Sequence, residues 1–228
     1  MPTFVHIKTL YMDKLIIFDL DGTLINTIED LGTAVNYAME RCGYPLHTMD
    51  EYAAMVGNGV RMLVTRALPE HLKGDRSVID TALPIFERYY TEHIDVYTKP
   101  YDGMPELLAH LKQAGIKIAV ATNKFQEGAD KIIAKVFPAI RFDAIYGNRP
   151  GVPLKPDASV IHQILETTGV EAADALYIGD TEVDMATAVN GGVRSVGVTW
   201  GYRDRSNLGA ADTIVDTIDA LEGLIFDR

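Results

Sequence analysis

Two aspartates that could do chemistry stand two residues apart, directly after a short apolar run near the start of the chain. The run covers Leu15 to Phe18, and the aspartates are Asp19 and Asp21. Four consecutive apolar residues predict a fully buried strand of a parallel sheet, whose carboxyl end is the edge where open α/β sheets bind ligands. Because side chains alternate along an extended backbone, both carboxylates would point the same way. One could act as nucleophile and the other as proton donor.

Gly22 and Thr23 follow this pair and let the chain turn closely around a small anion. A calcium loop is an alternative that can be tested by counting. An EF-hand that starts at Asp19 needs an acidic or amide residue at its fifth position, Gly at its sixth and Glu at its twelfth. Those positions hold Thr23, Leu24 and Asp30, so the calcium reading is excluded. A strand end that carries carboxylates by chance is the other alternative, and the residues downstream argue against it.

Three further segments lie where strands end or helices begin. They are Thr122-Asn123, Lys155-Pro156 and Gly179-Asp180, the last with Asp184 four residues after its aspartate. Together with the first aspartate pair, these segments resemble, in order, the four motifs of the haloacid dehalogenase-like phosphohydrolases. The resemblance spans residues 19 to 184.

This resemblance implies hydrolysis of a phosphomonoester. Asp19 would attack phosphorus and form an aspartyl phosphate, while Asp21 would protonate the leaving oxygen and later accept a proton from water. A carboxylate that approaches a phosphate dianion meets a repulsion of roughly 8 kcal/mol at about 4 Å and an effective dielectric of about 20. Mg²⁺ is the expected remedy, with Asp19, the backbone carbonyl of Asp21 and Asp180 among its oxygen ligands.

Each of the remaining motif residues could have a catalytic role or an ordinary structural one. Asp184 could support the metal or orient Lys155, or be a favourable acid in the first turn of a helix. Lys155, at the predicted start of a helix with Pro156 at its first position, could neutralise Asp19 and the phosphate, or simply be solvated. Thr122 would donate its hydroxyl to a phosphoryl oxygen. Asn123 would add an amide donor, cap the next helix, or do both.

Composition describes an ordinary globular protein of one or two domains. The 228 residues are 47% apolar and 23% charged, and the formal net charge is −11. This charge argues against nucleic acid and anionic membranes as partners, and a small phosphorylated metabolite would have to be attracted locally by a cation. The single cysteine, Cys42, and the lack of a long apolar run or signal sequence favour the cytoplasm. We expect residues 1–11 to lie outside the fold, and the oligomeric state, monomer or homodimer, is left open.

Strands and helices alternate through most of the chain, which predicts an α/β fold with a doubly wound parallel sheet. The expected strands are residues 14–18, 116–121, 142–146, 175–178, 194–198 and 212–215. The expected helices between them are residues 104–114, 127–136, 157–168 and 182–190. Most of these helices are followed by a glycine or proline stop.

Nearly a hundred residues separate the first strand from the second. Within them, residues 27–41, 48–56, 59–68 and 75–93 have helical patterns, and Thr48 with Glu51 forms a capping box. We therefore expect residues 27–95 to form an inserted helical cap, hinged at 26–28 and at 96–101. Residues 12–26 and 96–228 would form the catalytic core.

One cap segment could contact a substrate. Val56 to Arg61 contains two glycines that flank Asn58 and opens a helix, so its backbone donors and Arg61 could receive an anion. An ordinary turn between cap helices is the alternative reading. With the helical cap and the first motif, this segment resembles the phosphoglycolate phosphatases most closely.

Other reactions of the family, and one function that is not enzymatic, are alternatives to phosphomonoester hydrolysis. Dehalogenases lack the second aspartate, which is Asp21 here, and Lys73 has no support as the cap lysine of a phosphonatase. Pyrophosphatases and β-phosphoglucomutase share the core and the cap type and remain alternatives. A phospho-accepting receiver module of a signalling system is the alternative that is not an enzyme, but such modules are about half this length and have no cap.

Overall fold

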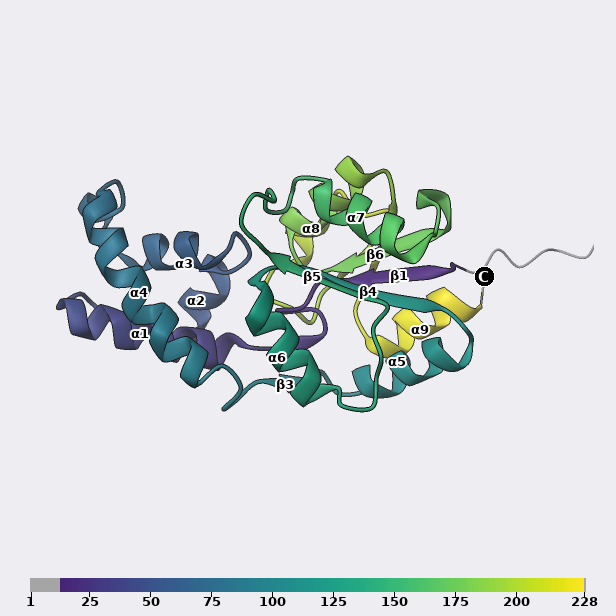
Figure 1. Cartoon of the computed structure of the whole chain (residues 1–228), viewed down its shortest axis with the longest axis horizontal. Coiled ribbons are helices and arrows are strands. Elements are labelled where there is room, and N and C mark those ends of the chain that lie inside the picture. Colours follow the sequence, from purple (N-terminus) through teal and green to yellow (C-terminus); the bar gives the residue numbers. More distant parts are fainter. Residues whose placement is uncertain (1–12, 228) are drawn as a thin grey trace, which may run out of the picture.

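A computed structural model describes residues 13–227 as a layered α/β unit with a helical bundle beside it (Figure 1). The expectation for residues 1–11 concerns positions outside the described residues. All strands of the main sheet run parallel, in the order β5-β4-β1-β6-β7-β8. Their bounds are β1 (Leu15–Phe18), β4 (Lys117–Phe125), β5 (Ala144–Asn148), β6 (Ala175–Gly179), β7 (Arg194–Val198) and β8 (Thr213–Val215). The predicted α/β fold class is confirmed.

Strand β1 lies between β4 and β6 and is completely buried. Its last residue, Phe18, is in register with Val120 of β4 and Ile178 of β6. Because parallel strands end at the same edge, the residues that follow these three positions come together there. The first, second and fourth motifs are thereby brought to one edge of the sheet.

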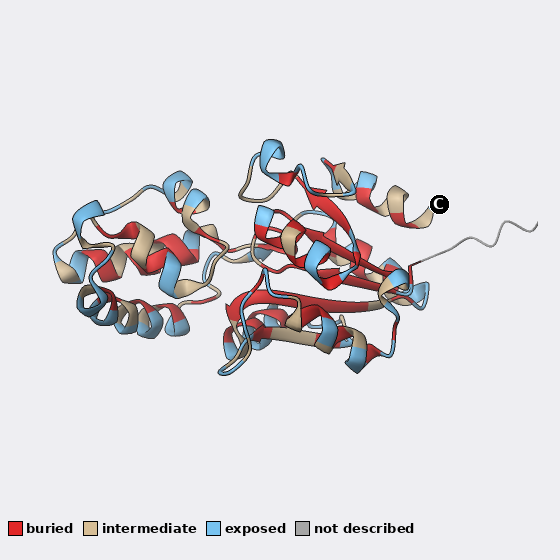
Figure 2. Ribbon diagram, turned by 90° about the horizontal axis from the view of Figure 1, so that it is seen from above, coloured by how far each residue is buried: buried red, intermediate tan, exposed pale blue. Residues whose placement is uncertain are grey.

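Helices cover both faces of the sheet (Figure 1). One face carries α7 (Ser159–Thr168) and α8 (Glu182–Gly191), and the other carries α5 (Met104–Gln113), α6 (Gln126–Val136) and α9 (Ile218–Phe226). The buried residues form one apolar cluster on each side, and Figure 2 shows them concentrated in the strands and on the inner sides of the helices. This packing holds the strand ends in a rigid frame.

Helices α1 (Ile28–Cys42), α2 (Met49–Met55), α3 (Val60–Ala67) and α4 (Arg76–Glu92) form the bundle. They correspond to the four helices expected there, and the Thr48–Glu51 capping box is present. The largest buried side chains of the bundle are aromatic: Tyr52, Phe86 and Tyr90. In this bundle, amphipathic helices bury their apolar faces against each other rather than against the sheet.

Two chain crossings connect the bundle to the sheet. The short strands β2 (Ile25–Asn26) and β3 (Lys99–Pro100) pair there, antiparallel to each other. The buried carboxylate of Asp30 in α1 accepts hydrogen bonds from the backbone N–H groups of Tyr97 and Thr98 at 2.8 to 3.1 Å. The return crossing is therefore fixed to the first helix. Two-residue strands have no periodicity, so the sequence did not predict this ribbon.

Several element boundaries differ from expectation, and two of the differences change the role of a predicted residue. Strand β4 continues to Phe125, and α6 begins at Gln126, so Asn123 lies in a strand and caps no helix. Helix α7 begins at Ser159, and the Lys155–Pro156 peptide bond before it is cis, so Pro156 is not a first helical residue. The side chain of Asp157 accepts a hydrogen bond from the Ser159 N–H at 2.8 Å, and the N-cap residue is Ala158. Helix α9 was not predicted.

Within the described residues, no helix is both long enough and apolar enough to span a membrane.

Candidate active site

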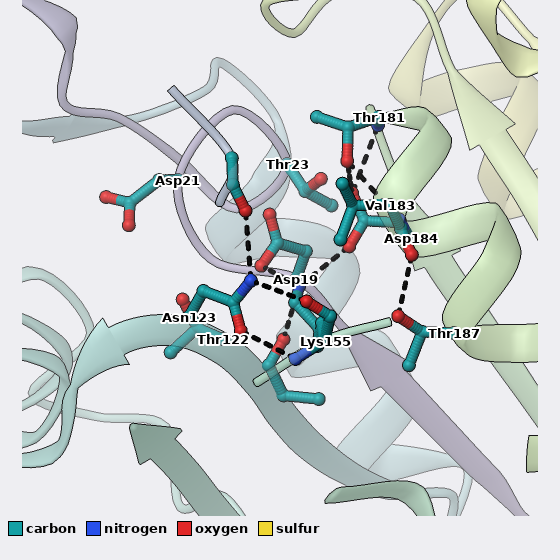
Figure 3. A network of polar contacts seen from close by, with 12 residues as sticks. Asp19, Asp21, Thr23, Thr122, Asn123, Lys155, Thr181, Val183, Asp184 and Thr187 are labelled. Atoms are coloured by element: carbon teal, nitrogen blue, oxygen red, sulfur yellow. Dashed lines mark hydrogen bonds and ion pairs between the residues drawn. The ribbon is translucent and has the colours of Figure 1, made fainter. Parts of the chain in front are cut away.

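Three carboxylates and one ammonium meet at the carboxyl edge of the sheet (Figure 3). Asp19 follows β1, Asp180 follows β6, Asp184 lies in the first turn of α8, and Lys155 precedes α7. One oxygen of each carboxylate lies within 4.8 Å of the others. All four side chains are buried. The sequence predicted this convergence, and the parallel strand order produces it.

Lys155 is the centre of this cluster. Its Nζ lies 2.7 Å from Asp19 Oδ1 and 2.7 Å from Asp184 Oδ1, and it also donates to the Ala121 carbonyl at 2.9 Å and the Tyr177 hydroxyl at 3.0 Å. An ammonium has three hydrogens, so these four acceptors already exceed its donor capacity. Lys155 therefore orients the two carboxylates and is not simply solvated.

Burial and like charges set the protonation behaviour of the cluster. Burial, with the carboxylate of Asp184 next, raises the pKa of Asp19 well above its ordinary value, although Lys155 opposes this. Burial and Asp184 also raise the pKa of Asp180 to about 7. Burial lowers the pKa of Lys155, but Asp184 and Asp19 outweigh that effect and hold it well above the usual value. When all three acids are ionised, three carboxylates face one ammonium, and this excess of negative charge is part of the reason that the pKa values of Asp19 and Asp180 are raised.

The donor set fits a hard divalent cation. Every candidate ligand atom is a carboxylate oxygen, the type that Mg²⁺ prefers. Two glycines leave room for Asp180: a Cβ on Gly22 would come within 2.4 Å of Asp180 Oδ2, and a Cβ on Gly201 within 2.3 Å of the same atom. The backbone therefore packs tightly around the carboxylate that would bind the metal together with Asp19.

Asp184 has both of its oxygens occupied by protein donors. Oδ1 accepts from Lys155 and from the Tyr177 hydroxyl at 3.0 Å, whereas Oδ2 accepts from the N–H of Thr181 at 3.0 Å and its hydroxyl at 2.6 Å. The contacts of Oδ2 form a capping box at the start of α8. These contacts favour a role for Asp184 in orienting Lys155 over direct metal ligation. Asp184 is also an acid in the first turn of α8, as the alternative interpretation expected.

Asp21 lies apart from this cluster, as Figure 3 shows. Its carboxylate accepts from Lys124 Nζ at 2.9 and 3.2 Å and from the Thr27 hydroxyl at 2.7 Å. Lys124 also donates to the hydroxyl of Tyr90, from helix α4, at 2.6 Å. Burial raises the pKa of Tyr90 well above its ordinary value, so that the hydroxyl stays neutral. The sequence analysis did not single out Lys124, although it directly follows Thr122-Asn123 at a strand end.

A small cavity of about 40 Å³ lies between the sheet edge and the bundle. The core side contributes Asp19, Asp21, Thr122, Asn123, Lys124, Lys155 and Thr181. The bundle side contributes Leu31, Val56, Gly57, Gly59, Val60 and Leu63. One wall is therefore polar and charged, and the other is apolar.

The three predicted phosphate-binding residues of the core have different surroundings. Thr122 lines the cavity, and its Oγ1 accepts from the Lys124 N–H at 3.1 Å, so its own hydrogen can be donated to a ligand. Asn123 also lines the cavity, but its amide donates to the carbonyls of Gly57 at 3.0 Å and Lys155 at 3.2 Å. The hydroxyl of Thr23 donates to Asp180 Oδ1 at 3.0 Å, so it supports that carboxylate and does not line the cavity.

The structure does not bring Arg61 and Asn58 to the cavity. Arg61 Nη2 pairs with Asp80 at 2.5 Å on the surface, where both side chains are more than half exposed. Asn58 Oδ1 accepts from Arg66 at 2.8 Å. The helical period explains why Arg61 lies on the surface. Val60 and Leu63 share the face of α3 that lines the cavity, and Arg61 is turned about 100° from Val60.

Arg203, which the sequence analysis missed, joins the two sides of the cavity. It follows β7 and donates to the carbonyl oxygens of Ala53 at 2.5 Å and Val56 at 2.6 Å, at the end of α2. Its Nε lies 3.3 Å from Glu182 Oε2 in α8. The guanidinium fixes the bundle loop before Gly57 to the helix that carries Asp184. Only its position after a strand end could have indicated this role.

Comparisons with known proteins agree with this geometry. A family model described as haloacid dehalogenase-like hydrolase matches residues 16–198. The phosphoglycolate phosphatase of Agrobacterium fabrum is 33% identical over 222 residues, which cover 95% of this chain and 94% of that protein. The phosphoglycolate phosphatase of Aquifex aeolicus is 32% identical over 189 residues, which cover 83% of this chain and 86% of that protein.

A solved structure from Lactobacillus delbrueckii subsp. bulgaricus has a closely similar fold. It superposes with a TM-score of 0.90 at 32% identity and covers 95% of this chain and 100% of its own. That protein was provisionally assigned as a phosphoglycolate phosphatase. The similarity therefore includes the bundle as well as the sheet.

Proposed function

The chain belongs to the haloacid dehalogenase-like hydrolases, in which it is a phosphoric monoester hydrolase, and we propose that it hydrolyses 2-phosphoglycolate with Mg²⁺ through an aspartyl phosphate. The observation that carries the proposal is the buried cluster of Asp19, Asp180 and Asp184 around Lys155, beside a small cavity. The names of the relatives support the substrate.

In this mechanism Asp19 is the nucleophile. Lys155 binds its Oδ1, and within the described residues no hydrogen bond reaches its Oδ2, which leaves that oxygen to attack phosphorus. The bond from phosphorus to the leaving oxygen breaks, and Asp21, which lines the same cavity, supplies a proton to that oxygen. Asp21 then takes a proton from the water that attacks the aspartyl phosphate and releases inorganic phosphate.

Asp19 and Asp180 would hold the metal, with the backbone carbonyl of Asp21, while Asp184 would orient Lys155. Bound Mg²⁺ would neutralise charge on the phosphoryl group. Thr122 would donate its free hydroxyl hydrogen to a phosphoryl oxygen. Residues 27–95 would act as the cap, because their helices supply the apolar wall of the cavity and leave the phosphoryl chemistry to the core. The cytoplasmic location and the oligomeric state stay predictions.

The test is a phosphate-release assay with purified protein, Mg²⁺ and a panel of 2-phosphoglycolate, sugar phosphates, nucleotides and pyrophosphate. We expect the highest kcat/KM for 2-phosphoglycolate. Chelation should reduce the rate more than Asp21→Asn does, because removing the cation restores a repulsion of roughly 8 kcal/mol, whereas losing proton transfer costs about 3 to 5 kcal/mol. Full activity after exhaustive EDTA treatment would refute the metal role.

The same assay separates the alternatives. A mutase would transfer the phosphoryl group to a sugar phosphate and release little inorganic phosphate in water. A receiver-like module would become phosphorylated without turnover. A preference for pyrophosphate would leave the family reaction in place and remove the proposed substrate.

A further inference from the structure

We propose that Lys124 is the residue that binds an anionic group on the leaving part of the substrate, which makes it the specificity-determining cation of the cavity. The inference rests on the proposed phosphatase function. In this inference Lys124, which lies beside the proton donor Asp21, binds the carboxylate of a short phosphorylated hydroxy acid such as 2-phosphoglycolate.

The position of the leaving group follows from the chemistry. Asp21 must reach the oxygen that leaves phosphorus, so the atoms attached to this oxygen lie near the carboxylate of Asp21. Lys124 Nζ is 2.9 Å from Asp21 Oδ1, and Lys124 lines the same cavity. A carboxylate one carbon beyond the leaving oxygen is therefore within reach of this ammonium.

The other cations near the cavity are already occupied. Among the described residues that line it, Lys124 and Lys155 are the only basic ones, and Lys155 has four acceptors. Arg203 donates to two carbonyls of α2 and faces Glu182. Among the described residues, Lys124 Nζ donates to Asp21 Oδ1 at 2.9 Å, to Asp21 Oδ2 at 3.2 Å and to the Tyr90 hydroxyl at 2.6 Å. The contact with Oδ2 is the longest of the three and the second to the same carboxylate, so a substrate carboxylate can replace it while Asp21 keeps the other contact.

The apolar wall makes this charge selective. The wall consists of Leu31, Val56, Val60 and Leu63, whose side chains form no hydrogen bonds. The hydroxyl groups of a sugar would therefore lose their hydrogen bonds to water here and gain none in return. Next to such a wall, the attraction between an ammonium and a carboxylate is stronger than in water. The cavity of about 40 Å³ holds roughly three or four water-sized groups, which favours a leaving group of few atoms.

Lys124 is also held in place before a ligand arrives. Its side chain is 2% exposed, and its ammonium lies 4.9 Å from the centre of the Tyr90 ring while it donates to the Tyr90 hydroxyl. Little side-chain entropy remains to be lost on binding. Tyr90 is thus a positioning residue, and Lys124 is the group that touches the substrate.

The experiment compares kcat/KM for 2-phosphoglycolate and for 2-hydroxyethyl phosphate, an analogue of similar size whose leaving group carries no charge, in the presence of Mg²⁺. We expect the native protein to prefer 2-phosphoglycolate. In Lys124→Met the ratio of the two kcat/KM values should fall by about 10- to 150-fold, the range for one hydrogen bond to a charged group. Any disturbance of Asp21 slows both substrates and cancels in the ratio.

Two further variants sharpen the comparison. Lys124→Gln keeps a hydrogen-bond donor for Asp21 but removes the charge, so it should lose the preference as Lys124→Met does. Lys131→Met is the matched control, because this lysine joins α6 to the Thr91 carbonyl at 3.2 Å outside the cavity. It removes the same charge and should leave the ratio unchanged. Circular dichroism of each variant checks the fold.

If the Lys124 variants lower both rates equally, or the native protein shows no preference between the two substrates, the inference is overturned and the phosphatase function stands. No phosphate release from either substrate overturns the proposed function itself. If neither Lys124 variant folds, inhibition of aryl phosphate hydrolysis by the native protein decides the matter. Glycolate should then inhibit at least about tenfold more strongly than glycolamide, and equal inhibition overturns the inference.

Discussion

Lys155 brings together two carboxylates that would otherwise repel each other in a buried site. It contacts Asp19 and Asp184 at the same distance of 2.7 Å, and its backbone is held in turn by the side chain of Asn123. Asp19, the proposed nucleophile, therefore has a fixed orientation before the substrate enters. Such preorganisation removes reorganisation from the reaction itself.

The first prediction concerns the nucleophile. Asp19→Asn should leave less than about 1% of the phosphatase activity, because an amide cannot attack phosphorus, whereas Asp21→Asn should still form the phosphorylated protein at a rate about 10²- to 10⁴-fold lower. Steady-state rates and a single-turnover phosphorylation assay measure the two effects. An Asp19→Asn protein that kept a few per cent of the native rate would contradict the covalent mechanism.

The second prediction concerns Asp184. Both of its oxygens accept hydrogen bonds, so an amide at this position would place its NH₂ against a donor. Asp184→Asn should therefore raise the Mg²⁺ concentration needed for half-maximal activity by about 10- to 100-fold. Asp216→Asn, at an exposed ion pair with Arg205, is the control. An unchanged Mg²⁺ requirement in Asp184→Asn would show that this carboxylate is not needed to orient the site.

The sequence predicted much of this cluster and missed its neighbours for a physical reason. Asp19, Asp180 and Lys155 follow buried strands or precede a helix, and parallel strand order alone brings such positions together. Lys124 and Arg203 acquire their roles from contacts with the bundle, at Tyr90 and at the end of α2. The orientation of the bundle depends on tertiary packing, which no local pattern contains. Arg61, which was expected at the cavity, lies on the surface because Val60 and Leu63 occupy the face of α3 that lines the cavity.

At the scale of elements, polar side chains of the core bind the end of α2 and the loop after it. The side chains of Arg203 and Asn123 bind three carbonyl oxygens there, those of Ala53, Val56 and Gly57. These carbonyls belong to the last turn of α2 and the loop after it, where the final helical acceptors have no partner within the helix. The core thus completes the helix end and positions the loop that lines the cavity.

The third prediction follows from this contact. Arg203→Met should lower kcat/KM for 2-phosphoglycolate by about tenfold, mainly through KM. The reason is that the loop after α2, which lines the cavity, loses about 1.4 kcal/mol of stabilisation. Arg203→Lys should not restore it, since a single ammonium cannot reproduce the two-pronged contact. Arg205→Met, two residues away at an exposed ion pair, should behave like the native protein. Equal KM values for Arg203→Met and Arg205→Met would contradict the positioning role.

The six strands and the four bundle helices were predictable because each carries a strong periodic signal or a run of apolar residues. The β2–β3 ribbon was not, since its two strands have two residues each and exist only because the chain crosses between the bundle and the sheet twice. The start of α7 was placed too early because Pro156 was read as a first helical residue.

At the scale of the whole molecule, negative charge is a property of both the surface and the buried site. The formal net charge is −11, and three of the carboxylates counted in it lie in the buried cluster beside a single lysine. Binding of a divalent cation to the folded state alone should therefore stabilise the protein.

The fourth prediction is a thermal shift. At a Mg²⁺ concentration about 100 times its Kd, folding should gain about 2.7 kcal/mol, which corresponds to a rise in Tm of roughly 5 to 10 °C for a chain of this size. Asp180→Ala should abolish most of the rise. NaCl at matched ionic strength separates specific binding from screening. The same rise with NaCl would contradict a built metal site.

The division of the cavity between two units also bears on how new substrate preferences can arise. Lys124 belongs to the sheet, whereas Tyr90 and the apolar wall belong to the inserted bundle. A chimaera that receives the bundle of a sugar-phosphate enzyme would have a different cavity wall but would keep Lys124. Transfer of this bundle to the sheet of another enzyme would likewise separate the apolar wall from Lys124. If Lys124 has the proposed role, a new substrate preference would therefore require substitutions in both the sheet and the bundle.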